Sequence, residues 1–419
     1  MLSSNIQQAV TELAKGRIVV LVDDEQKNEG DLVMAAARAT PEAVAFMVRH
    51  TSGVICAALP GRRLDELQLP LMPADNTDAQ RGAFTVSVDA RHGTTTGISA
   101  ADRVATIRAL IHPDTKPGDL ARPGHIFPLR AVEGGVLRRM RPTEATVDLA
   151  RAAGLYPAGI LAEVVNDDGA LARGRQLETF AETHGLTIAS IGDLVQYRRR
   201  TEQLVKRLSQ ARLPTRHGDF AIHVYESLID GIQHVALVMG DVASIANVLV
   251  RVHSECLTGD IFGSMRCDCG RQLDEAFARV AAEGRGVIVY LRGHEGRGIG
   301  IGHKVSAYRL QDQGRDTLEA NLELGLPVDA RDYSVGAQIL ADLGVTSIRL
   351  MTNNPAKYDS IAEFGLSISE RVPLVTKPTR HNLQYLRAKQ QKMGHLLDLA
   401  EDKPSRSMSL DRVCASAVE

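Results

Sequence analysis

The chain has 419 residues, 44% hydrophobic and 24% charged, a composition typical of globular proteins. Its formal net charge of −2 excludes a global basic field that would recruit nucleic acid, and no run approaches the roughly 18 consecutive apolar residues of a membrane span. The length predicts two domains of about 200 residues each. The first residues, MLSSNIQQAVTELAKG, indicate a short amphipathic helix without the apolar segment of a signal peptide, so we expect a cytoplasmic protein.

The first half alternates strand-like and helix-like segments. The apolar runs IVVLV and GVICAAL predict short strands, and FTVSVDA alternates apolar and polar residues as a half-buried strand does. PEAVAFMVRHT and SAADRVATIRALI carry apolar residues at helical spacing. These segments predict an α/β domain over residues 1–200, and the basic, polar stretch 193–216 predicts a solvated helix and a domain junction.

An acidic stretch, DDEQKNEGDL, follows the first predicted strand at residues 23–32. Acids crowded at the end of a buried strand commonly bind a metal ion or transfer protons. The stretch is therefore a candidate site in the first half.

The second half begins with the strand-like segments FAIHVYES and QHVALVMG and then alternates again. GVIVYL and SIRLM predict strands, and YSVGAQILADLG predicts a helix, so a second unit of α/β or α+β type is expected over residues 201–401. Residues 402–419 have no clear period and predict a flexible tail.

Three of the five cysteines, Cys256, Cys267 and Cys269, have the spacing Cys-x10-Cys-x-Cys with no fourth cysteine nearby. Three protein ligands with one open position are typical of catalytic zinc, which activates a bound water near neutral pH. The alternative is two buried helix cysteines and an unrelated third. Because CDC stands beside Arg266, it is a poor core pattern, and the zinc interpretation is favoured.

A strand runs into alternating glycines in VIVYLRGHEGRGIGIGHK. The spacing differs from the dinucleotide fingerprint G-x-G-x-x-G. With Arg292, Arg297 and Lys304 around it, the loop favours a triphosphate, and a plain glycine-rich turn is the alternative.

Two polar stretches follow, and each is also compatible with an ordinary polar loop. In VDARDY, Asp329 and Arg331 stand two apart, so both can share one face of an extended segment. LMTNNPAK ends a predicted strand with the polar residues Thr352, Asn353, Asn354 and Lys357, where α/β proteins bind ligands.

The motifs RVHSECLTGD, SMRCDCG, EGRGIG, LQDQGRDTLEAN, DARDY and TNNPAK, in this order, resemble GTP cyclohydrolase II from about residue 220 to residue 397. The resemblance implies a cyclic-amidine hydrolase in which Cys256, Cys267 and Cys269 bind zinc. It implies GTP contacts from Arg251, Val252, His253, Ser254, Glu255, Gln272, Glu295, Gly296, Arg297, Thr317, Thr352 and Lys357.

The same resemblance implies the chemistry. Water activated by zinc attacks C8 of guanine, and a second hydration releases that carbon as formate. Asp329 matches the proton acceptor, Tyr308 is a candidate proton donor, and Arg331 matches a nucleophile that attacks the α-phosphate and expels pyrophosphate. Because guanidinium is protonated at ordinary pH, Arg331 can instead be an electrostatic clamp. Magnesium is expected with the triphosphate.

The first half resembles 3,4-dihydroxy-2-butanone 4-phosphate synthase over residues 5–198, through NEGDL, RHTSGVICAAL, TTTGISAADR, ARPGHIFPLRA, PTEATVDLA and LAEVVNDDG. A fusion of the two is the layout of the bifunctional riboflavin-biosynthesis enzyme. The synthase family converts ribulose 5-phosphate with magnesium to a four-carbon phosphate and formate. Matching site residues are Glu29, Asp31, Cys56, His125, Thr143 and Glu163, with Thr95, Asp102 and Arg103 also retained.

The metal ligands of that family are not retained. Its loop normally reads DDEDRENEGD, whereas this loop reads DDEQKNEGD and is one residue shorter. Its GGHTEA segment reads RRMRPTEA here, so that Pro142 stands at the histidine position and has no ligand atom. We therefore expect that the magnesium site is lost and the synthase half is degenerate.

Other interpretations of the first half stay open. The enzyme can be fully bifunctional, or the first half can be a regulatory or dimerisation module of a homodimer. The altered pocket can also bind a phosphate through Arg138, Arg139 and Arg141 without a metal.

Overall fold

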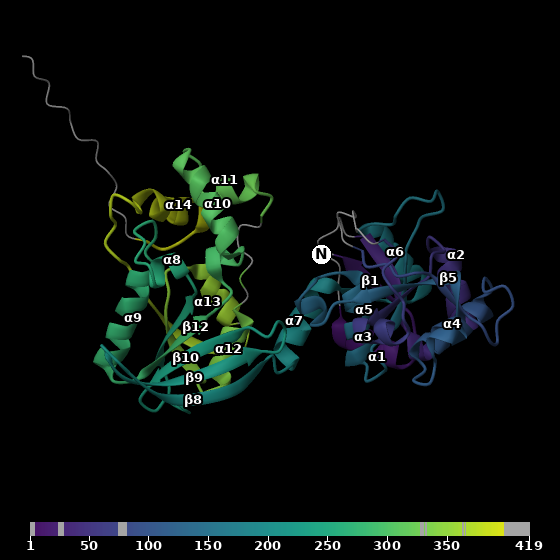
Figure 1. Ribbon diagram of the computed structural model, residues 1–419, viewed down its shortest axis with the longest axis horizontal. Helices are drawn as coiled ribbons and strands as arrows, with labels where there is room; N and C mark the ends of the chain where they lie inside the picture. The colour runs from purple at the N-terminus through teal and green to yellow at the C-terminus, as the bar shows by residue number, and fades with distance from the viewer. Residues whose placement is uncertain are drawn as a thin grey trace, which may run out of the picture. The chain divides into compact units, whose positions relative to one another are not determined.

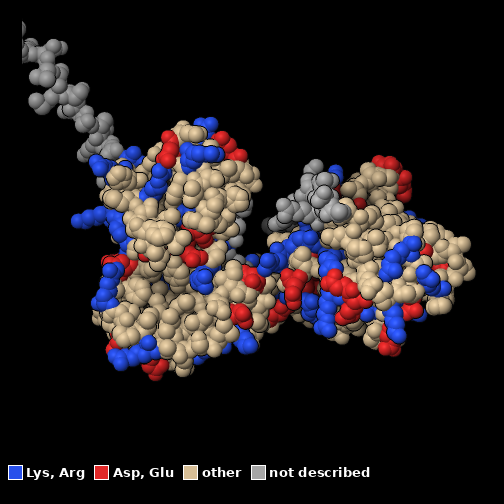
Figure 2. All heavy atoms as spheres, viewed as in Figure 1, with Lys and Arg blue, Asp and Glu red and all other residues tan. Residues whose placement is uncertain are grey.

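The computed structural model describes residues 5–23, 29–73, 82–326, 331, 333–362, 364 and 366–397. The chain divides into two compact units, one of Met1–Leu204 with Ser227–Gly231 and one of Val205–Glu226 with Ile232–Glu419. In the view of Figure 2, basic and acidic side chains are interspersed over each unit, as the small net charge leads one to expect. Within the described residues, the longest apolar helices fall short of the length and hydropathy needed to cross a membrane.

The first unit mixes helices and strands along the chain (Figure 1). Its helices are α1 (Ile6–Ala14), α2 (Pro41–His50), α3 (Gly61–Glu66), α4 (Ala100–Ile111), α5 (Pro142–Ala152), α6 (Arg175–His184) and α7 (Ile191–Thr201). Its strands are β1 (Val19–Asp23), β2 (Glu29–Ala35), β3 (Cys56–Pro60), β4 (Val88–Ala90), β5 (Leu120–Ala131), β6 (Gly159–Glu163) and β7 (Thr187–Ser190).

These strands form one mixed sheet in the order β4-β5-β3-β6-β2-β1-β7. Alternate residues of β1 and β2 go to opposite faces: Val20 and Leu32 join a core with α2 and α4, while Leu21 and Val33 join a core with α1 and α5. A sheet covered by helices on both faces confirms the predicted α/β class.

The second unit contains strands β8 (Val205–Thr215), β9 (Gly218–Ser227), β10 (Gln233–Met239), β11 (Val248–Ser254), β12 (Gly286–Leu291), β13 (Ser347–Met351) and β14 (Ser367–Val372). Its helices are α8 (Leu257–Asp260), α9 (Cys269–Glu283), α10 (Gly300–Asp312), α11 (Thr317–Glu323), α12 (Ser334–Asp342), α13 (Pro355–Ala362) and α14 (Leu383–Met393). Helix α9 packs on one face of the sheet, and α12 and α13 pack on the other.

The sheet of the second unit has the order β14-β13-β11-β12-β10-β9-β8, with β11 parallel to both β12 and β13. The chain passes from β11 to β12 on one side and later to β13 on the other side. Such a change of direction leaves a crevice at the carboxyl ends of the strands, where open α/β sheets bind ligands. Figure 1 shows α10, α11 and α14 grouped beyond one end of this sheet.

The prediction of one solvated helix over residues 193–216 is wrong. Helix α7 ends at Thr201, and strand β8 begins at Val205. The segment that reads as polar and helical forms a mostly exposed edge strand because it lies beside β9. Pairing with a neighbouring strand outweighed the local propensity of the sequence.

Candidate active site

The candidate site of the second unit begins where three parallel strands end. Strand β11 ends at Ser254, β12 at Leu291 and β13 at Met351, and the segment after each strand carries polar residues. Because β11 lies between the other two, the segments after all three reach one crevice.

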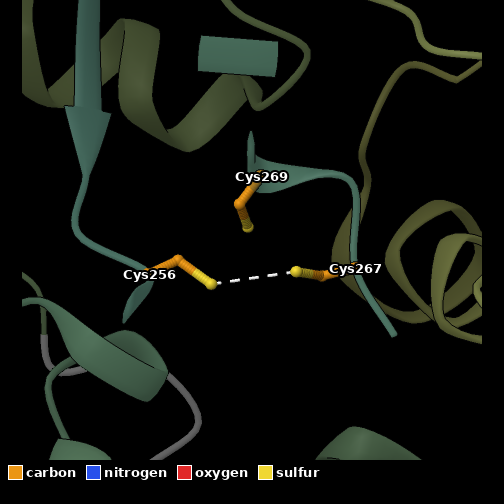
Figure 3. Close-up of side chains that lie close together, drawn as sticks. All are labelled: Cys256, Cys267 and Cys269. Atoms are coloured by element: carbon orange, nitrogen blue, oxygen red, sulfur yellow. Dashed lines mark hydrogen bonds between the residues drawn. The ribbon is translucent and has the colours of Figure 1, made fainter. Parts of the chain in front are cut away.

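The three thiols converge in this crevice (Figure 3). Cys256 follows β11, Cys267 lies in a loop and Cys269 is the first residue of α9. The Sγ atoms of Cys256 and Cys267 are 3.7 Å apart, and all three Sγ atoms lie within 4.8 Å of one another. Tetrahedral thiolates at a Zn–S distance of about 2.3 Å would be about 3.8 Å apart. Among the described residues, these thiols are the one group in which three or more potential metal ligands come together.

The backbone around the thiols leaves space for an ion. A Cβ atom placed on Gly259 would lie 2.9 Å from the Sγ of Cys267 and 3.1 Å from the Sγ of Cys256. Any larger residue there would fill the space between the sulfur atoms. The donor set, the spacing and the glycine all fit zinc.

A lysine supports the charge of the thiol cluster. The Nζ of Lys304, on α10, donates to the Sγ of Cys256 at 3.1 Å and to the Oγ1 of Thr258 at 2.9 Å, and it also pairs with the buried Glu295. Contacts with the thiols of Cys267 and Cys269, and the nearby Lys304 ammonium, lower the pKa of Cys256. The thiolate is the form that binds metal, so Lys304 favours ligation through Cys256. The contact with Cys256 raises the pKa of Cys267 and Cys269, which remain thiols until a metal ion displaces their protons.

A buried carboxylate orders the strand that leads to Cys256. The Oδ2 of Asp260 accepts from the backbone N–H of Cys256 at 3.0 Å and from the Tyr290 hydroxyl at 2.8 Å. The Nε2 of His253 lies 3.0 Å from the same carboxylate, and burial lowers the pKa of His253. Such outer contacts orient metal ligands.

Most of the residues predicted to contact GTP line one cavity together with the thiols. These are Arg251, His253, Ser254, Glu255, Gln272, Gly296, Arg297, Thr317, Thr352 and Lys357. The other two lie differently: the Val252 side chain packs in the core of the sheet, and Glu295 binds Lys304 and the backbone N–H of Leu257. Lys357 donates to the carbonyl oxygen of Val252 at 2.7 Å, so the backbone of Val252 still takes part in the site.

Of the predicted catalytic residues, Arg331 and Tyr308 line the same cavity. The guanidinium of Arg331 lies 5.5 Å from the ring centroid of Tyr333, and the Nζ of Lys357 lies 4.6 Å from that ring. The hydroxyl of Tyr308 is 3.2 Å from the Oγ1 of Thr258, and burial raises the pKa of Tyr308, which keeps it protonated as a donor must be. Asp329 lies outside the described residues.

Several cavity residues were not predicted from the sequence. They are Arg266, His294, Gln311, Asn321, Tyr385, Lys389 and His395. The last three come from α14 and the segment after it, where no motif signals a ligand site. Asn353 and Asn354, which the LMTNNPAK segment predicts as ligand-binding groups, also line the cavity.

The first unit has a separate pocket around the acidic strand β2. Asp31, Cys56, Thr143 and Glu163 line it, together with Arg139, Arg141 and Pro142. Pro142 is the first residue of α5, and a guanidinium nitrogen of Arg141 lies 4.0 Å from the Oδ2 of Asp23. The pocket thus has a cationic side chain near its acids and a proline at the predicted ligand position.

Burial and mutual repulsion govern the acids of this pocket. Burial, then the charges of Glu163, Asp23 and Glu29, raise the pKa of Asp31 to about 8. Burial raises the pKa of Cys56 to about 12. Both shifts mark sites where negative charge is poorly supported.

The other residues predicted for a site in this half each contact a partner side chain. Glu29 pairs with Arg173, through an Nε-to-Oε1 contact of 3.0 Å. The Nδ1 of His125 lies 2.8 Å from Asp89. Arg139, considered above as a phosphate ligand, donates to the buried Glu144 at 2.6 Å. Residues 24–28, where the loop is shorter than the family pattern, lie outside the described residues.

Two family models match the chain. The model of 3,4-dihydroxy-2-butanone 4-phosphate synthase matches residues 7–197, and that of GTP cyclohydrolase II matches residues 206–373. The two matches fall one in each half of the chain, in the order that the motifs indicate.

Similar proteins cover nearly the whole chain. The riboflavin biosynthesis protein RibBA of Salinispora tropica is 60% identical over 94% of this chain and 98% of its own length. The bifunctional riboflavin biosynthesis protein RIBA 1, chloroplastic, of Arabidopsis thaliana is 56% identical over 94% of this chain and 74% of its own length. The crystal structure of RibBX, a two-domain 3,4-dihydroxy-2-butanone 4-phosphate synthase from A. baumannii, is 36% identical with a TM-score of 0.67, covering 88% of this chain and 99% of that chain.

Proposed function

The chain belongs to the family of bifunctional riboflavin biosynthesis proteins, and from this premise we propose that its second unit is a working, zinc-dependent GTP cyclohydrolase II. The reaction converts GTP to 2,5-diamino-6-ribosylamino-4(3H)-pyrimidinone 5′-phosphate, formate and pyrophosphate. The observation that carries the proposal is that three converging thiols open into the cavity that holds Arg297, Arg331 and Lys357.

The residues of this chain then have separate tasks. Cys256, Cys267 and Cys269 hold zinc, which when bound supplies Lewis-acid activation of water. Cationic side chains of the cavity balance the triphosphate, which magnesium is expected to accompany. Tyr308 holds a proton at its hydroxyl for transfer to the opened ring.

Arg331 is proposed to act on the α-phosphate. Its guanidinium lies over the Tyr333 ring, which Lys357 also contacts, and this position suits a clamp on a leaving pyrophosphate. The nucleophile role inferred from the family motif requires Asp329 as proton acceptor beside it. Trapping of a covalent phosphoguanosyl adduct on Arg331 would distinguish nucleophile from clamp.

We further propose that the first unit has lost synthase activity. Pro142 has no ligand atom, and the guanidinium of Arg141 brings positive charge near Asp23, where a magnesium ion would compete with it. Shortening of the acidic loop removes the second expected ligand.

A second candidate, the fully bifunctional enzyme, is favoured by two observations. Asp31, Cys56, Thr143 and Glu163 still share a pocket, and relatives at 56% identity are named bifunctional. Both candidates predict that the purified protein releases formate from GTP with zinc. Only the second predicts that it consumes ribulose 5-phosphate with magnesium, so a paired assay on one preparation separates them.

The homodimer, the cytoplasmic location and the boundary between residues 200 and 201 stay predictions. Sedimentation, cell fractionation and limited proteolysis test them in turn. Deletion of residues 1–200 tests the assembly role of the first half, because a dimerisation module predicts that deletion changes the oligomeric state.

A further inference from the structure

Helix α14 supplies a wall of the cyclohydrolase cavity although it lies beyond residues 206–373, the extent of the family match. Tyr385 and Lys389 of this helix, with His395 just after it, line the cavity together with the thiols. The residues after α14 also contact the site, since the backbone N–H of Leu396 donates to the carbonyl oxygen of Asn353 at 2.8 Å. Asn353 follows Thr352, a predicted GTP contact.

Lys389 makes a specific contact with the cysteine loop. Its Nζ donates to the Oδ1 of Asp268 at 2.9 Å, and the two residues are only 8% and 2% exposed. Asp268 stands between Cys267 and Cys269. Its carboxylate therefore fixes the backbone that presents two of the three thiols.

The other carboxylate oxygen of Asp268 connects to residues that are predicted to contact GTP. The Oδ2 atom accepts from the side-chain amide of Gln272 at 2.5 Å. The Oε1 of Gln272 accepts from Arg251 at 2.7 Å, and Arg251 also donates to the carbonyl oxygen of Met351 at 2.8 Å. One buried carboxylate thus links α14, the thiols and two predicted GTP contacts.

Stability alone is a weak reason for such a pair. Removing two charges from water costs free energy that their attraction often fails to recover. The same helix has an ion pair with a smaller desolvation cost, in which the Nζ of Lys392 lies 3.2 Å from Glu319. The Lys392 side chain is 43% exposed. Lys392 can attach the helix to α11, so a second, buried lysine needs another reason.

We propose that Lys389 is a positioning residue of the cyclohydrolase site, which through Asp268 sets the Cys267–Cys269 turn for zinc and Gln272 and Arg251 for GTP. The proposal rests on the proposed function of the second unit. It makes α14 part of the catalytic unit, so the working enzyme extends at least to residue 397.

The test compares Lys389→Met with the matched control Lys392→Met in the full chain. Zinc affinity is measured by competition with a chromogenic chelator, and kcat and KM for GTP by formate release. We expect Lys389→Met to weaken zinc binding by about 10- to 100-fold and to raise the KM for GTP, because an outer contact of metal ligands is lost. Lys392→Met should stay within about threefold of the parent, as expected of a surface pair.

Conservative variants separate positioning from folding. Lys389→Arg keeps the charge and should recover most of the zinc affinity, and Lys389→Gln covers the case in which the Met variant does not fold. Unfolding transitions of all variants are recorded, because a purely structural lysine would lower them without moving zinc affinity or KM at a temperature where the protein is folded.

A double-mutant cycle completes the test. If Lys389 acts through Asp268, then Lys389→Met in an Asp268→Asn background should cost little more than Asp268→Asn alone. Additive losses, or a Lys389→Met variant with the zinc affinity and KM of the parent, would overturn the proposal. A parent protein that binds zinc but releases no formate would instead overturn the proposed function.

Discussion

The second unit brings three potential metal ligands together, whereas the described acids of the first unit form no comparable group. In the second unit, Cys256, Cys267 and Cys269 face one another within 4.8 Å, and their neighbours orient them toward a common point. In the first unit, burial and the nearby charges of Glu163, Asp23 and Glu29 raise the pKa of Asp31, and two of these acids have cationic partners. Glu29 pairs with Arg173, and Asp23 faces Arg141.

We expect metal binding to depend on the arrangement of ligand-type residues more than on their number. An ion needs donors that converge on one point. The thiols do so, and Lys304 supports negative charge beside them. In the first unit, Glu29 and Asp23 already lie beside arginine side chains of the same chain. Asp31 is buried among other acids, and its pKa is raised.

The largest effect should come from breaking the thiol centre. Cys267→Ser is expected to lower formate release from GTP by about a thousandfold or more, because two thiolates cannot retain a catalytic zinc ion. Zinc content after gel filtration, measured alongside formate, should fall in parallel.

The control for this prediction is Cys56→Ala, which removes a buried thiol of the first unit. It should keep both the zinc content and the cyclohydrolase activity. A Cys267→Ser protein that still holds one zinc per chain and releases formate at the parent rate would remove the contrast between the two units.

The second prediction attempts to rebuild the magnesium site that we propose the first unit has lost. Replacing Gln26 and Lys27 by the family sequence Asp-Arg-Glu, together with Arg141→Gly and Pro142→His, supplies both missing ligands and removes the competing guanidinium. We expect magnesium-dependent consumption of ribulose 5-phosphate to rise at least about 100-fold above the parent.

Neither half of this repair should suffice alone, because each supplies one of two ligands. The loop replacement alone and the Arg141→Gly, Pro142→His pair alone are therefore the matched controls. Substantial turnover by the unmodified parent would establish the bifunctional alternative.

A third prediction tests whether the thiol centre tolerates a side chain at position 259. Gly259→Ala places a methyl group 2.9 Å from the Sγ of Cys267, so we expect zinc affinity to fall about 10- to 100-fold, as when outer contacts of a metal site are disturbed. Gly302→Ala on α10 is the control, since a Cβ there meets nothing within 4 Å. Equal zinc affinities in the two variants would mean that the glycine is not required.

How far the sequence predicts these sites depends on how local their signals are. The three thiols fall in one short stretch, and their spacing alone indicated an open zinc site. The polar residues after β13 are predicted because ligand-binding groups of α/β proteins follow strands, and the glycines and cations after β12 predict a phosphate loop. These signals need only local sequence and the fold class, whereas the contacts of Arg251 to Glu255 are implied by the family resemblance.

The contacts that sequence reasoning missed are long-range. Lys389 meets Asp268 across 121 positions, and no local pattern of α14 distinguishes this lysine from the exposed Lys392. The composition of residues 205–215 predicts a helix, but the segment forms strand β8. Its pairing with β9 determines this structure. Such pairings depend on the folded chain and have no signature within the segment itself.

The last prediction concerns the pH dependence of the stability of the first unit. The pKa of Asp31 is raised from 3.8 to about 8 in the folded state, so the folded chain holds a proton that the unfolded chain loses above about pH 4. The free energy of unfolding of this unit should therefore fall as pH rises from about 4 to about 8, by at most about 1.4 kcal/mol per pH unit. Asp31→Asn should flatten this slope, whereas the control Asp114→Asn, at a side chain 91% exposed, should not. Calorimetry can follow the two units separately, because added zinc raises only the transition of the unit that binds it. A pH slope that survives in Asp31→Asn would show that another group carries it. A parent protein without the slope would show that a cation or a partner charge relieves the acidic pocket, and the contrast with the thiol centre would then narrow.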